Sequence, residues 1–122
     1  MLGRIEQLLM FVLPVQLDEP VRQVLQRYRS GYESLNAKAV LAVYPGIPVQ
    51  KLDDTFKLYS SLKQEIAIDR VGVDRQTATV TATVTTAPTP KNGKPITPQK
   101  SKAVFSLKKS GDTWLIQDVS FK

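Results

Sequence analysis

The sequence predicts an α+β fold in which helices pack on the concave face of a curved antiparallel sheet. From residue 18 to residue 62, apolar residues recur at helical spacing, and after that the period changes to two. Three later segments have the composition of strands, namely Thr77–Ala87, Lys100–Lys109 and Thr113–Phe121. Helices followed by an antiparallel meander are typical of the α+β class.

The first 17 residues predict a short apolar helix that is separate from the domain formed by residues 18–122. Its apolar run, residues 8–13, is shorter than the core of a signal peptide or a membrane span. Pro14 is expected to end this helix. An apolar stripe of Leu2, Ile5, Leu9 and Leu13 is expected to pack on the same domain or on a second copy. The alternative is the end of an anchor or linker from a longer protein.

Three helices are predicted between residues 18 and 61. Asp18 is a good N-cap and Pro20 suits a first turn, so the main helix is expected to begin there. Asn36 caps a shorter helix, Ala37–Val43, and a third helical piece lies near Leu52–Ser61. The buried stripe of the main helix is expected to hold Val21, Val24, Leu25, Tyr28, Tyr32 and Leu35.

The rest of the chain predicts four strands. Gln64–Val73 is the first, with a bulge near Gly72. In the second strand, threonine alternates with alanine or valine, which is the pattern of a half-buried strand. Residues 88–98 contain four prolines, so we expect an exposed and poorly ordered hairpin loop before the last two strands.

Composition excludes several kinds of chemistry. The chain has no cysteine and no histidine, which excludes disulfides, thiolate or imidazole metal sites and histidine general bases. No phosphate-binding loop or cluster of metal ligands is present, so no cofactor and no metal are predicted. The composition is compatible with the cytoplasm and with an extracytoplasmic domain of a larger bacterial protein.

The net charge of +6 is concentrated near the C-terminus. Residues 89–122 hold seven lysines and two aspartates. These lysines are spread over a loop and two strands, where lysine commonly protects exposed strand edges, and no arginine follows Arg75. The distribution argues against nucleic acid as a partner.

The order of elements resembles the nuclear transport factor 2-like superfamily, which includes ketosteroid isomerase and the small polyketide cyclases. The resemblance covers about residues 18–122 and is carried by "VRQVLQRYRSGYESLNAKAVLAVYP", "DDTFKLYSSL", "QTATVTATV" and "AVFSLKKSGDTWLIQDVSFK". Within this superfamily, the chain most resembles an uncharacterised type of accessory domain that is found in larger bacterial proteins. It implies a cone-shaped domain with a pocket at its wide end.

The resemblance also implies that an enzyme of this kind would use an acid and a tyrosine hydroxyl inside the pocket. Asp118 is the best candidate for the acid, because simple alternation places it on the same face as Trp114 and Ile116, and Tyr28 is the candidate donor. Asp53 and Asp54 are interpreted as helix-start acids, and Asp69 as an exposed or arginine-paired acid. The candidate ligand-binding residues are aromatic: Tyr28, Tyr32, Phe56, Tyr59, Phe105 and Trp114.

Two functions are therefore predicted as alternatives. The first is a non-catalytic binding or assembly module, which uses the cone for a small apolar ligand or a sheet face for self-association. The second is an isomerase- or cyclase-like enzyme that uses an Asp118–Tyr28 pair. A homodimer is expected because one face of the second strand consists of threonine at positions 77, 79, 81, 83 and 85.

Overall fold

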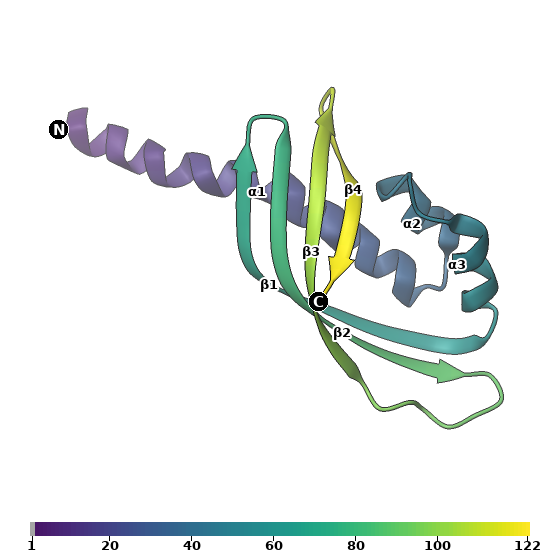
Figure 1. Ribbon diagram of the computed structural model, residues 1–122. Coiled ribbons are helices and arrows are strands. Elements are labelled where there is room, and N and C mark those ends of the chain that lie inside the picture. The colour runs from purple at the N-terminus through teal and green to yellow at the C-terminus, as the bar shows by residue number, and fades with distance from the viewer. Residues whose placement is uncertain (1) are drawn as a thin grey trace.

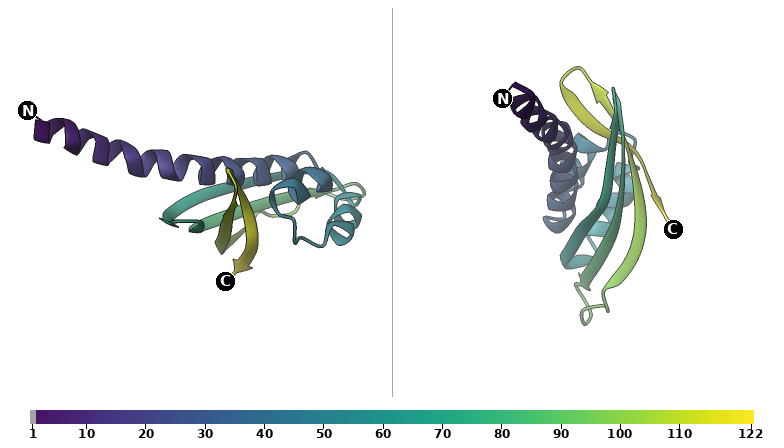
Figure 2. Two further views of the ribbon diagram at one scale, coloured as in Figure 1. Left: turned by 90° about the horizontal axis from the view of Figure 1, so that it is seen from above. Right: turned by 90° about the vertical axis from the view of Figure 1, so that its left-hand side faces the viewer.

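Three helices precede a four-stranded antiparallel sheet in the part of the chain that the structure describes. This computed structural model describes the backbone of residues 2–122 and the side chains of residues 18–122. The strand order is β1-β2-β3-β4, and the helices lie on one face of the curved sheet (Figures 1 and 2), which confirms the predicted fold class. The elements are α1 (Leu2–Glu33), α2 (Ala37–Val43), α3 (Val49–Phe56), β1 (Tyr59–Asp74), β2 (Thr77–Pro90), β3 (Gln99–Ser110) and β4 (Thr113–Phe121).

Helix α1 is one continuous helix, so the predicted break at Pro14 and the predicted start at Asp18 are wrong. A proline inside a helix removes one hydrogen bond and crowds the carbonyl four residues earlier, but helix formation is cooperative, so helical turns on both sides of Pro14 can offset this cost. The N-terminal half of α1 projects beyond the sheet (Figures 1 and 2). The predicted packing of the apolar stripe at residues 2–13 concerns side chains outside those described. Within the described part of the chain, no helix combines the length and the apolarity needed to cross a membrane.

The remaining helices begin and end for local reasons. The side chain of Asn36 accepts a hydrogen bond from the Ala39 N–H at 3.1 Å, which confirms the predicted cap and bounds of α2. Helix α3 ends at Phe56 rather than near Ser61. The chain after Phe56 is instead drawn into β1, where Tyr59 pairs with Pro90.

The sheet is longer than predicted at the end that holds the proline-rich segment. Strand β2 continues to Pro90, and only residues 91–98 form the exposed loop. Pro88 is tolerated in β2 because no partner strand needs its missing N–H. A residue at this position would direct its N–H toward β3, and the pairing of β2 with β3 ends two residues earlier, at Thr86 and Gln99. The Pro88 carbonyl accepts a hydrogen bond from the Ile96 N–H at 3.1 Å instead.

Bulges on β1 and β4 set the direction of side chains along the sheet. The register of β1 shifts between Ile68 and Arg70, so the bulge lies at Asp69 and not near Gly72 as predicted. A second shift occurs on β4, where Ile116 pairs with Leu107 and Asp118 pairs with Ser106. Gln117 is therefore the extra residue of a bulge, and it reverses the alternation of the residues that follow.

The core lies between the inner face of the sheet and the buried stripe of α1. The predicted stripe of α1 is confirmed at Val21, Val24, Leu25 and Tyr28, which are all buried. The inner face of the sheet contributes alternate residues, as period-two patterning requires. Its buried members are Leu62, Ala78, Val80, Ala82, Val84, Ala103, Phe105, Leu107, Trp114 and Ile116.

Candidate functional site

Four of the six predicted ligand-binding aromatics pack on one another inside the cone. Tyr28 contacts Phe105 edge to face, with ring centroids 5.5 Å apart, and contacts Tyr32 at 4.8 Å. Tyr32 in turn contacts Phe56 edge to face at 5.4 Å. These edge-to-face contacts are the arrangement that aromatic quadrupoles favour. The four rings thus form a continuous chain from β3 through α1 to α3.

The hydroxyl groups of three tyrosines gather at this cluster. Burial raises the pKa of Tyr28 far above its ordinary value of 10.0, and the neighbouring hydroxyls of Tyr32 and Tyr44 raise it further. Burial also raises the pKa of Tyr32. Among the residues whose side chains are described, the groups that act on the Tyr28 hydroxyl are tyrosines, and none of them is a carboxylate that could take its proton.

We expect alkaline pH to destabilise the protein partly through Tyr28. Below pH 10.0 the side chain is protonated in both the folded and unfolded chains, whereas above it only the unfolded chain ionises. The contribution of Tyr28 to the free energy of unfolding should therefore fall by about 1.4 kcal/mol for each pH unit above 10.0. In Tyr28→Phe, urea titrations between about pH 10 and about pH 11.5 should show a shallower fall. Equal slopes in the two proteins would contradict a buried, neutral Tyr28.

The other two predicted aromatics lie apart from these stacked rings. Tyr59 is half-buried at the start of β1 and packs against the core. Trp114 is buried and lines a surface groove of about 270 Å³ between α1 and the β3–β4 turn. The ligand-binding roles predicted for these six residues stay predictions, and the stacked group is the part that the fold brings together.

Asp118 lies on the outer face of the sheet, so the prediction that it shares a face with Trp114 and Ile116 is wrong. Its side chain is exposed, and it pairs with Ser106 across the ladder. The bulge at Gln117 is the cause, because it turns Val119 inward and Asp118 outward. Asp118 and Tyr28 are consequently on opposite sides of the sheet.

The remaining predicted acids are held in surface contacts. Asp69 is exposed and pairs with Lys102 at 3.1 Å rather than with an arginine. Asp53 pairs with Lys57 at 3.3 Å, and Asp54 accepts a hydrogen bond from Gln50 at 3.1 Å. Both acids lie in the second half of α3 and not at its start. Within the described residues, no group of three or more acidic side chains is close enough to hold a metal ion.

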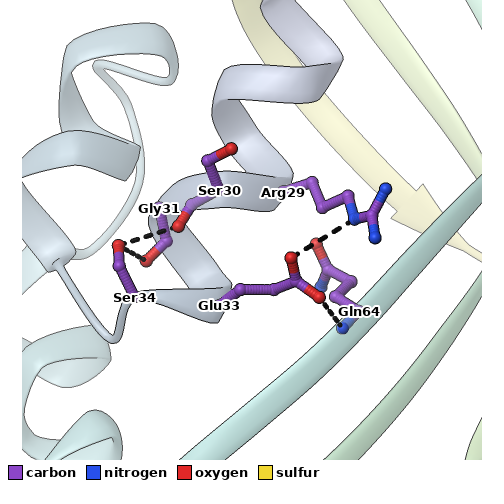
Figure 3. A network of polar contacts seen from close by, with 6 residues as sticks. All are labelled: Arg29, Ser30, Gly31, Glu33, Ser34 and Gln64. Atoms are coloured by element: carbon purple, nitrogen blue, oxygen red, sulfur yellow. Dashed lines mark hydrogen bonds and ion pairs between the residues drawn. The ribbon is translucent and has the colours of Figure 1, made fainter.

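A polar network between α1 and β1 was not predicted from the sequence. Glu33 accepts a hydrogen bond from the backbone N–H of Gln64 at 3.0 Å, and its other oxygen lies 3.4 Å from Arg29 Nε. Gln64 is buried, and its Oε1 has no hydrogen-bond partner among the described residues. Figure 3 shows its side chain rising from β1 toward α1 beside Glu33.

Of the two residues that join α1 to β1, the inward direction of Gln64 is predictable from the sequence, whereas the role of Glu33 is not. Gln64 falls in the same alternation as Leu62, Ile66 and Ile68, which places it on the inner face. Glu33 follows the half-buried Tyr32 on α1, and periodicity places it on the solvated face. Its contact with β1 spans 31 residues and is fixed only by the packing of α1 on the sheet.

Comparison with known proteins identifies the fold. No protein-family model matches the chain, and no curated protein matches it. Among solved structures, a candidate scytalone dehydratase from Novosphingobium aromaticivorans is 11% identical with a TM-score of 0.76, over 89% of this chain and 85% of that one. A nuclear transport factor 2-like superfamily protein from Salmonella enterica is 11% identical with a TM-score of 0.75, over 89% of this chain and 92% of that one.

A third similar structure places the same fold within a longer polypeptide. Bd1075 of Bdellovibrio bacteriovorus is 13% identical with a TM-score of 0.66, and the match covers 85% of this chain but only 40% of that one. Together these structures establish that the chain has the nuclear transport factor 2-like fold, in agreement with the resemblance seen in its sequence.

Proposed function

We propose that the protein is a non-catalytic binding and assembly module that associates with a second copy of itself through the outer face of its sheet. The observation that carries this proposal is the direction of the side chains. Aromatic rings stack on one another inside the cone, whereas Asp118 and Asp69 point outward. An enzyme that used a paired aspartate and tyrosine would need the acid inside.

The outer face has the properties of a wet protein interface. The threonines of β2 form its central row, and Thr81 and Thr83 are already half-buried by their neighbours. Val104 of β3 lies opposite Thr81 in the ladder. The ion pair between Asp69 and Lys102 joins β1 to β3 across this row and neutralises one lysine. The short side chains in the middle of this face and its one paired charge favour close approach of a second sheet.

The binding role of the module would use the partly open end of the aromatic cluster. Tyr32 is half-buried there, and its ring contacts Phe56 edge to face at 5.4 Å. A small apolar ligand would stack on such rings. The similar structure in which this fold forms 40% of a longer chain supports an accessory role within a larger assembly.

We expect the substitution Thr81→Lys to weaken self-association by at least about tenfold, which is the effect of about 1.4 kcal/mol. A lysine in the middle of the outer face would add a like charge beside its counterpart in a two-fold interface. Analytical ultracentrifugation across a concentration series measures the change. Gln23→Lys adds the same charge on the exposed face of α1 and should leave the dissociation constant unaltered. A monomeric wild-type protein at high micromolar concentration would contradict the proposal.

A further inference from the structure

A narrow groove lies between α1 and the edge strand β1, away from both the aromatic cluster and the outer face. Its volume is about 160 Å³. Leu25, Ile66 and Ile68 form an apolar floor, and Arg22, Gln26 and Arg29 line the α1 side. An apolar strip flanked by two guanidinium groups suits a ligand that is apolar in the middle and anionic at both ends.

The backbone of β1 is open beside this groove. β1 pairs with β2 on one side only, so it is an edge strand. The N–H of Gln64 points away from β2, because it donates to Glu33. In an antiparallel ladder the N–H and C=O of alternate residues point the same way, so those of Ile66 and Ile68 also face the open edge. Unpaired edge groups of this kind are a template for another strand.

The charges of the groove are available to a partner. Arg22 is exposed and takes part in none of the ion pairs among the described residues. Arg29 contacts Glu33 through Nε, and its side chain is still 46% exposed. The two arginines are separated by two turns of α1, which is about 10 Å along the helix axis.

We propose that β1 binds an extended acidic segment of a partner protein, which adds to the sheet as a further strand. Its side chains facing α1 would follow the pattern acid, any residue, apolar, any residue, acid. In a strand the two acids of this pattern are about 13 Å apart, a span that two flexible arginine side chains separated by about 10 Å can meet. The apolar residue between them covers Leu25, Ile66 and Ile68.

Two observations favour this partner over other occupants. A fatty acid has a carboxylate and an apolar tail, but it leaves the N–H and C=O groups of Ile66 and Ile68 unpaired. A second copy of the chain, paired edge to edge through β1, would bring the arginines of both copies together in a protein whose net charge is already +6. The proposal concerns a surface other than the outer sheet face and stands independently of dimer formation there.

A labelled peptide with the sequence TETLTET tests the proposal by fluorescence anisotropy on the full chain. We expect micromolar binding that weakens by about tenfold or more in Arg22→Glu. Arg27→Glu makes the same charge change on α1 outside the groove and should alter binding by less than about twofold. A peptide of equal composition, TTELETT, places the leucine on the face opposite the acids and should bind weakly.

A charge reversal on both sides separates a lost contact from a misfolded variant. Binding of TKTLTET to Arg22→Glu should recover part of the affinity that TETLTET loses, with an unchanged circular dichroism spectrum. Absence of binding at high micromolar protein would overturn the proposal. So would equal effects of Arg22→Glu and Arg27→Glu, equal binding of both peptides, or complete displacement of the peptide by octanoate.

Discussion

The substitution Phe105→Ala is expected to lower the free energy of unfolding by about 3–5 kcal/mol. Phe105 is 0% exposed and lies on β3, in the interior of the sheet. Its ring packs edge to face on Tyr28, and its ladder neighbours are Val80 and Val119. Alanine would leave a cavity that these neighbours fill only in part, because two of them are fixed by the sheet.

Urea denaturation followed by circular dichroism measures this loss. Phe121 supplies a matched control, since it is the same residue type on the neighbouring strand but is 57% exposed. Phe121→Ala should cost less than about 1 kcal/mol, because little apolar area is removed from contact. Similar losses in the two variants would show that the aromatic chain through Phe105 is not the centre of the core.

Elements whose structure depends on local contacts were predictable from the sequence. The start of α2 follows from the cap at Asn36, a hydrogen bond between residues only three apart in the chain. β4 follows from its alternation and from the turn at Gly111, whose positive φ of 61° favours glycine. The buried stripe of α1 likewise follows from helical periodicity.

Features that depend on distant partners were not predictable. The bulge at Gln117 is visible only in the pairing of β3 with β4, and simple alternation therefore gave Asp118 the wrong face. The contact between Glu33 and Gln64 depends on how α1 crosses β1. The aromatic cluster was predicted in part, because helical and strand periodicity identify inward residues, but which rings touch is set by tertiary packing.

The second large effect is expected at Gly31, where α1 passes close to Val40 of α2. A Cβ at this position would lie 2.7 Å from Val40 Cγ2 and 3.0 Å from the Val40 backbone nitrogen. In an open helix, glycine to alanine is stabilising by about 1 kcal/mol. Here we expect Gly31→Ala to destabilise the protein by about 1–3 kcal/mol, because the nitrogen of Val40 is held within α2 and cannot move away alone.

Thermal and urea denaturation of four variants, namely Gly31→Ala, Val40→Ala, their double variant and Ser30→Ala, test this expectation. Ser30→Ala, at the adjacent exposed position of α1, should change stability by less than about 0.5 kcal/mol. Adding Val40→Ala to Gly31→Ala removes the Cγ2 contact but not the nitrogen contact. The double variant should therefore be more stable than the sum of the two single losses predicts, by about 0.5 kcal/mol or more. If Gly31→Ala were as stable as the wild type, the two helices would have to separate at little cost, and the close crossing would have no part in fixing α2 against the core.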